Sequence, residues 1–139
     1  MRRYSYETDT AIAAEKLFRA KADIRRWPEW DSEIETTSFD APLGAGSPFV
    51  LKPRGGPKVS MLIEQVEAPR RFVDIALLPL AKMRTCSEFL PSADGTHIRI
   101  SIEVFGPLAF LWDRVVARKL ADDCEQQTKR FIAFVENQP

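Results

Sequence analysis

The chain contains one histidine, His97, and imidazole is the side chain best suited to acid–base chemistry near neutral pH. The sequence does not support a Ser-His-Asp triad, because no serine stands in a Gly-x-Ser-x-Gly motif. A zinc site with two or three histidine ligands is excluded by their number. His97 falls near a hairpin turn, at a position of the outer face, so we interpret it as a surface residue rather than a catalytic one.

The two cysteines, Cys86 and Cys124, show no metal-ligand spacing, and neither has a neighbouring histidine or lysine signal that would activate a thiolate. We interpret both as packing residues, and we expect neither a metal nor a cofactor. The N-terminal "MRRYSYETD" carries basic residues without a following apolar stretch, so it does not fit a secretory signal. We therefore expect a cytoplasmic protein with two reduced thiols.

Three polar residues in apolar strands are better candidates for a ligand site. Asp74, in "RFVDIAL", either points to solvent by alternation or enters the interior with a raised pKa, and alternation favours solvent. Thr85 and Ser87 fall in the middle of an otherwise apolar strand face, and ligand pockets combine apolar walls with a few oriented polar groups. The alternative for both hydroxyls is that they fill a crowded sheet centre.

Length and composition describe one globular domain, residues 1–139. A chain of this length can hold a single core without metal or disulfide bonds. Twenty acidic residues balance twenty basic ones, and this lack of net positive charge argues against a nucleic-acid binder. No apolar run approaches the roughly 20 residues that span a bilayer, so no membrane span is expected.

Hydrophobic periodicity predicts the elements that would position these groups. Residues 2–10 alternate and predict a first strand, and "TAIAAEKLFRAKAD" has helical spacing with many alanines. Pro28 is expected to break the helical segment that "DIRRW" begins. Six strand candidates follow, separated by Gly, Pro and Asp turn signals: residues 32–39, 48–53, 58–67, 71–77, 82–90 and 96–105. Their short links predict an antiparallel meander, and after Gly106-Pro107 a long helical segment reaches the C-terminus.

The last hairpin of this meander can be assigned a register. With Phe89 opposite Ile98, two pairs of opposite charge face each other on the outer side: Glu88 with Arg99, and Arg84 with Glu103. The inner, concave side then holds one apolar set with two hydroxyls in its middle: Met83, Thr85, Ser87, Phe89, Ile98, Ile100, Ile102 and Val104. A slip of one residue would scramble both sides, so the pattern specifies this register.

The C-terminal helical segment carries two apolar stripes. The first contains Leu108, Leu111, Trp112, Val115 and Val116, and the second contains Leu120, Cys124, Phe131 and Val135. On an ideal helix the second stripe lies about 120–140° around from the first. Either the helix bends near Arg118, or its first turns cover something different from its last ones, such as a sheet end or a ligand site.

Two tryptophans stand close together in "DIRRWPEWD", which we interpret first as a structural corner, with Trp30 also a candidate for ligand contact. The segment "AAEKLFRAKADIRRWPEWD" resembles the first helix pair of the START-like (SRPBCC, helix-grip) superfamily. The resemblance continues in "GAGSPFVL", "VEAPRRFV", "DGTHIRISIEVFGPLAFL" and the closing helix, in the same order over essentially the whole chain. It extends to the polyketide cyclase/dehydrase-like branch.

This resemblance implies an α+β helix-grip fold, with about seven curved antiparallel strands around the C-terminal helix and short helices after the first strand. It also implies a mostly apolar cavity between sheet and helix. Met83, Thr85, Ser87, Ile100 and Ile102 would form one wall, Leu111, Trp112 and Val115 the other, and Trp30 would close the end.

The function implied is binding of a small hydrophobic molecule, for transport or sequestration. One alternative is a polyketide cyclase- or dehydratase-like enzyme, since such relatives can act by shaping a reactive chain. Another is a protein-interaction module of the co-chaperone or ribosome-associated type, for which a filled interior and an outer apolar patch would be the signs. Phe110 lies off the early stripe, exposed either at the cavity mouth or in a homodimer contact.

Overall fold

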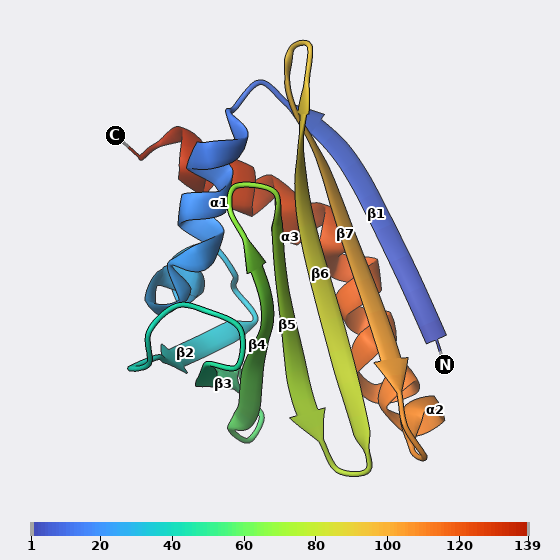
Figure 1. Cartoon of the computed structure of the whole chain (residues 1–139). Helices are drawn as coiled ribbons and strands as arrows, with labels where there is room; N and C mark the ends of the chain where they lie inside the picture. Colours follow the sequence, from blue (N-terminus) through green and yellow to red (C-terminus); the bar gives the residue numbers. More distant parts are fainter. Residues whose placement is uncertain (1, 139) are drawn as a thin grey trace.

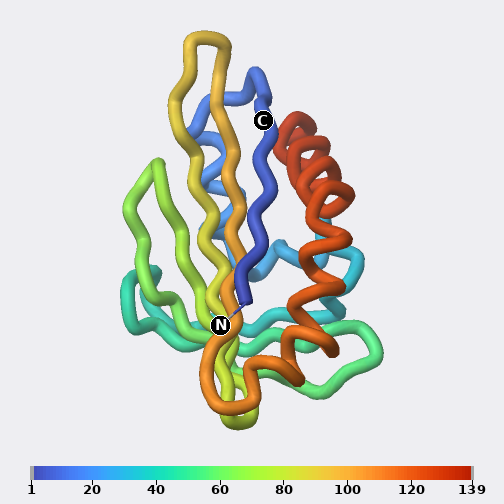
Figure 2. Tube along the Cα trace, turned by 90° about the vertical axis from the view of Figure 1, so that its right-hand side faces the viewer, coloured from blue at the N-terminus to red at the C-terminus, as the bar shows by residue number. Residues whose placement is uncertain are grey.

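The computed structural model describes residues 2–138 as a seven-stranded antiparallel sheet with a long C-terminal helix along one face (Figure 1; Figure 2). The α+β helix-grip prediction is thereby confirmed. In chain order the elements are β1 (Arg2–Thr10), α1 (Ala14–Ala22), the 3-10 helix η1 (Ile24–Glu29), β2 (Ile34–Ser38), β3 (Pro48–Pro53), β4 (Val59–Glu67), β5 (Arg71–Leu78), β6 (Ala81–Ser92), β7 (Gly95–Phe105), α2 (Ala109–Trp112), the π-helical turn η2 (Asp113–Ala117) and α3 (Arg118–Glu136).

The sheet order is β1-β7-β6-β5-β4-β3-β2, so the strands from β2 to β7 form the predicted meander and β1 closes onto the last strand. The predicted hairpin register is confirmed, with Phe89 opposite Ile98 and Glu88 opposite Arg99. The alternation of side chains therefore places one apolar set of β6 and β7 toward α3. Within residues 2–138, no helix is long and apolar enough to cross a membrane.

The tryptophan corner belongs to the core. Trp27 packs edge-on against Phe49 and Phe72, with ring centroids 5.5 and 6.2 Å away, and its indole N–H donates to the Lys21 carbonyl at 2.9 Å. The Trp30 ring lies 4.8 Å from that of Phe131 on α3. Aromatic pairs at such distances stabilise beyond their area burial, and these join η1 to both the sheet and the closing helix.

Pro28 does not end the helical segment where the sequence analysis expected. The 3-10 helix η1 continues through Pro28 to Glu29, and both Trp30 and Asp31 donate their backbone N–H groups to the Trp27 carbonyl. Proline disfavours the α conformation at the residue before it, but a short 3-10 helix can still include a proline. The only hydrogen-bond donor lost is the backbone N–H that proline lacks.

A π turn, η2, falls between the two apolar stripes of the C-terminal helix. A π turn contains about one more residue than an α turn, so it rotates the helix that precedes it by roughly 100° relative to the helix that follows. Trp112 is half-buried against the core, whereas the fully buried residues of this part of the helix are Asp113 and Ala117, which continue into the stripe of Cys124 and Phe131 at helical spacing. Leu111 and Val115 lie on the far side of the helix from Cys124 and are exposed.

Candidate functional site

The inner face of the sheet is a grid of side chains whose rows run across the strands. The cross-strand pairs give three rows: Phe49, Met61, Ala76, Met83 and Val104; Ile63, Asp74, Thr85, Ile102 and Tyr4; Phe72, Ser87, Ile100 and Tyr6. Polar groups occupy the centre of an otherwise apolar surface, on the strands farthest from the sheet edges.

Asp74 lies in the middle of this inner face, which corrects the expectation that it points to solvent. It is paired with Thr85 and is only 5% exposed. Burial raises the pKa of its carboxyl from 3.8 to about 6, and the Lys21 ammonium opposes that rise. No hydrogen bond within residues 2–138 contributes to the shift, so Asp74 is a buried acid without a close partner.

Two further polar groups of this region are buried without a partner in the described residues. The Ser87 hydroxyl belongs to a side chain that is 1% exposed, and the Trp30 indole N–H is equally sealed from solvent. Ser87 stands one residue pair along from Thr85, so it is a diagonal neighbour of Asp74, at about 7–8 Å between such positions. Leaving a buried donor unpaired costs about 1–3 kcal/mol, so both groups are suited to a partner supplied from outside the chain.

Lys21 brings a positive charge to the same end of the interior. Its ammonium lies 4.8 Å from the Trp27 ring centroid and 5.3 Å from that of Trp30. It also favours the ionised form of Cys124 on α3, although burial dominates and raises the pKa of that thiol. The sequence offered no signal for Lys21, because only the packing of α1 against η1 turns it inward.

The side of α3 that faces the sheet also combines apolar and polar side chains. Cys124 and Thr128 are buried, and the Cys124 Sγ lies 3.9 Å from the Thr128 Oγ1. Phe131 continues this stripe and stacks near Phe89 of β6, with ring centroids 6.3 Å apart. Cys124 is therefore a packing residue, as its position in the sequence indicated.

The middle of the inner face is not fully covered by α3. Thr85 and Ile100 are half-buried, although each lies on a strand with neighbours on both sides. Ile102, directly opposite Thr85, and Met83, in the adjoining row, are buried. Because the sheet covers the backbone of these strands, the remaining exposure of Thr85 and Ile100 is on the side that faces the helix.

The residues expected on the helical wall are divided. Trp112 is half-buried, and its indole N–H donates to the Pro79 carbonyl at 2.9 Å, which fixes it under the β5–β6 turn. Leu111 and Val115 are exposed, because their positions lie on the side of the helix away from the buried stripe. Asp113 takes the inward position instead; its carboxylate accepts a 2.6 Å hydrogen bond from the Tyr4 hydroxyl, and Arg118 approaches it at 3.7 Å.

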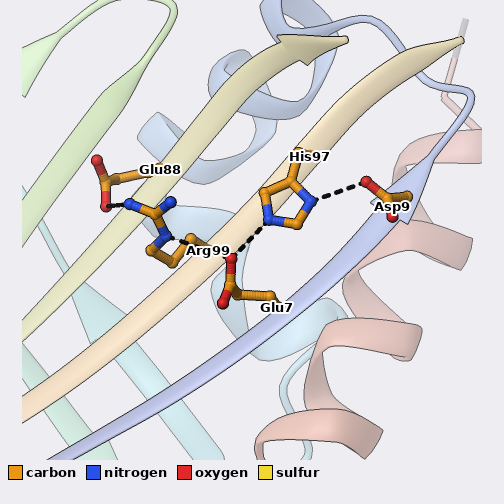
Figure 3. A network of polar contacts seen from close by, with 5 residues as sticks. All are labelled: Glu7, Asp9, Glu88, His97 and Arg99. Carbon is orange, nitrogen blue, oxygen red and sulfur yellow. Dashed lines mark hydrogen bonds and ion pairs between the residues drawn. The ribbon is translucent and has the colours of Figure 1, made fainter. Parts of the chain in front are cut away.

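His97 lies on the outer face opposite Leu90, as the register predicted. Figure 3 shows its ring held between two carboxylates of β1, with Nε2 2.7 Å from Glu7 and Nδ1 2.8 Å from Asp9. These contacts, led by Glu7, raise the pKa of His97. The cluster joins β1 to β7 on the convex side, away from the interior, so His97 is a structural residue of the sheet.

Two hollows are open to the surface. The larger, of about 670 Å³, is lined by Glu15, Phe18, Arg19, Ala22, Asp23, Leu43, Ala68 and Pro69. The smaller, of about 340 Å³, lies beside the β5–β6 turn and Gly106-Pro107. Neither is lined by the residues proposed from the sequence, so the interior site rests on the inner face described above.

A sheet of seven antiparallel strands closed by one long C-terminal helix, with short helices after the first strand, defines a START-like (SRPBCC) protein. The chain belongs to the family described as polyketide cyclase / dehydrase and lipid transport, which matches residues 1–136. Among curated proteins, none matches this chain.

Solved structures share the fold at low identity. Ara h 8.0201 is 15% identical with a TM-score of 0.77, over 99% of both chains. TTHA0849 from Thermus thermophilus is 18% identical with a TM-score of 0.71, over 96% of this chain and 97% of that one. StfQ, a di-domain ARO/CYC from the steffimycin biosynthetic pathway, is 12% identical with a TM-score of 0.76, over 96% of this chain and 50% of that one.

Proposed function

We propose that the domain binds a small hydrophobic molecule between the inner face of the sheet and α3. The observation that carries the proposal is the pair of buried polar groups without a partner in residues 2–138, the Ser87 hydroxyl and the Trp30 indole N–H, beside an otherwise apolar surface. A ligand oxygen that reached them would remove the cost of leaving them unpaired.

The ligand chemistry follows from these groups. The body of the molecule is apolar, and it carries one or two oxygens that accept from Ser87 or Trp30, with a hydroxyl that donates to Asp74 when this acid is ionised. The residues we propose to line the site are Trp30, Asp74, Met83, Thr85, Ser87, Ile100, Ile102 and Trp112. Leu111 and Val115 stand at the outer rim in this proposal rather than in the wall.

A thermal-shift screen with flavonoid-like compounds tests the proposal. A bound compound at a hundredfold excess over its Kd should stabilise the protein by about 2.7 kcal/mol. Ser87→Leu should fill the space and abolish the shift, whereas Ser87→Ala should only weaken it, by about tenfold in Kd for one lost hydrogen bond. Ser5→Leu, on the exposed side of β1, is the matched control. The proposal fails if no compound shifts the melting and native mass spectrometry finds no co-purifying molecule.

A second candidate function is favoured by Asp74. A buried carboxyl with a pKa of about 6 can both accept and return a proton near neutral pH. In a cyclase-type reaction the Asp74 carboxylate would take a proton from the carbon beside a ketone. The enolate would then close a ring on a second carbonyl, whose oxygen would take the proton back from Asp74. The new ring hydroxyl and a proton from the neighbouring carbon would then leave together as water. Mass spectrometry that follows this loss of water from a poly-ketone substrate tests the candidate, and Asp74→Asn should abolish the reaction while Ser87→Ala retains it.

The same proposal places the domain in the cytoplasm. Cys86 and Cys124 are free thiols, and both are buried. In a reducing compartment they would remain so. Fractionation of cells expressing the tagged chain tests this placement.

A further inference from the structure

The β5–β6 turn and the start of the C-terminal helix lie at the same end of the molecule (Figure 1), and these two segments contain four exposed large hydrophobic residues. We name them the apolar tip: Leu80 (67% exposed), Phe110 (64%), Leu111 (41%) and Val115 (57%). An outer apolar patch of this kind is the sign that the sequence analysis gave for an interaction surface.

The two segments of the apolar tip are fixed to each other. The Leu108 backbone N–H donates to the Leu80 carbonyl at 3.0 Å, and the Trp112 indole donates to the Pro79 carbonyl at 2.9 Å. Leu80 also has a φ of 54°, the one positive φ of a non-glycine residue within residues 2–138. A residue with a bulky side chain rarely adopts this left-handed backbone conformation, so the backbone of Leu80 is strained at the end of the turn, where its side chain is exposed.

Basic residues surround the apolar tip. On the C-terminal helical segment Arg114, Arg118 and Lys119 are exposed, and the last two approach carboxylates, Arg118 at 3.7 Å from Asp113 and Lys119 at 3.6 Å from Glu33. Lys82 lies on the other side, where it lines the hollow beside the β5–β6 turn. We name these four residues the basic collar.

The charge of this end differs from that of the whole chain. Residues 78–82 and 105–119 contain the four basic residues of the collar and one acidic residue, Asp113, whereas the chain as a whole is neutral. Asp113 is 2% exposed and is bonded to the Tyr4 hydroxyl. Because Arg118 pairs with Asp113 and Lys119 with Glu33, the positive charge around the apolar centre is carried chiefly by Arg114 and Lys82.

We propose that the apolar tip and the basic collar dock the domain reversibly on an anionic lipid bilayer. Apolar side chains enter the boundary between headgroups and acyl chains, while nearby Lys and Arg side chains bind the negative surface, and neither alone gives firm attachment. A second copy of the chain fits less well, because an isologous contact would bring two basic collars together.

Flotation of the full chain with lipid vesicles tests the proposal. The protein should float with vesicles of equal parts phosphatidylcholine and phosphatidylglycerol, and stay behind with phosphatidylcholine alone. Arg114→Glu should weaken binding by at least about fivefold, since each basic residue near an anionic surface contributes about that factor. Phe110→Ser should weaken it by about tenfold through lost apolar burial.

Two matched variants control for charge and for apolar surface. Arg19→Glu, at an exposed position of α1, and Leu43→Ser, in the β2–β3 loop, should bind the vesicles as the unchanged protein does. Raised salt should weaken the binding, because it screens the collar. Equal binding to both vesicle types, or equal losses in test and control variants, overturns the proposal. So does a dimer in sedimentation equilibrium that Phe110→Ser converts to monomer, since the tip then binds a second copy.

Discussion

Replacing Asp74 by Asn should stabilise the ligand-free protein at neutral pH, although it removes a charged residue from a central strand. The carboxyl is buried, and no hydrogen bond within the described residues holds its ionised form. The rise of its pKa from 3.8 to about 6 corresponds to about 3 kcal/mol, at roughly 1.4 kcal/mol for each pKa unit. Asn has nearly the shape of the protonated acid and carries no charge, so it avoids this cost.

The sign of the effect depends on pH. The folded pKa of Asp74 lies above the unfolded value, so the folded protein binds this proton more tightly. Below the unfolded pKa the acid is protonated in both states and costs nothing. Between 3.8 and about 6 the contribution of Asp74 falls as the pH rises, and above that window the loss stays constant.

Urea unfolding of the wild type and of Asp74→Asn, from about pH 4 to about pH 8, measures this difference. The two proteins should be nearly equal at the acid end, and the variant should be more stable at the alkaline end by up to about 3 kcal/mol. Asp40→Asn, an exposed change, should show no such growth with pH. A variant that is less stable than the wild type at pH 8, or a difference that does not change with pH, would refute the burial of an unpaired charge.

Three other predictions concern the frame that holds the site. Arg84→Glu should lower the free energy of unfolding by at most about 1 kcal/mol, because its ion pairs lie on the outer face of the sheet. Ile102→Asp should lower it several times more, because it buries a charge, and urea denaturation measures both. His97 should titrate with a pKa above 6.5 by NMR. The stability that protonated His97 adds should be lost as the pH rises through this folded pKa, and His97→Gln should abolish that pH dependence. Gly106→Ala should lower stability by more than about 1 kcal/mol in the same denaturation assay, because φ is +112° and a Cβ would lie 2.9 Å from the Ala81 Cα.

Most of the fold could be predicted from local patterns. The strands of the meander alternate, and the β6–β7 register follows from charge pairs on one side and an apolar set on the other. The face of Asp74 could not be predicted, because every residue from Phe72 to Ala76 is buried and alternation is lost. A strand covered on both sides carries no sign of which face is which.

Other features of the structure depend on contacts between residues far apart in the sequence, which local patterns do not show. The partners of His97, Glu7 and Asp9, lie 90 and 88 residues away on β1, and only the closure of β1 on β7 brings them together. Lys21 reaches the interior through the packing of two short helices. The offset of the two apolar stripes was visible in the sequence, but the π turn between them was not, since no residue type marks a π turn.

The π turn links the two proposed surfaces of the protein. Beside it the half-buried Trp112 donates its indole N–H to the Pro79 carbonyl, while Phe110 and Leu111 are exposed. Residues one and two positions apart on a helix point about 100° and 200° apart, so Trp112 and Phe110 face different ways within this segment. The interior site and the docking tip are therefore opposite faces of the same two helical turns, and a change that regularised the turn would disturb ligand binding and vesicle binding together.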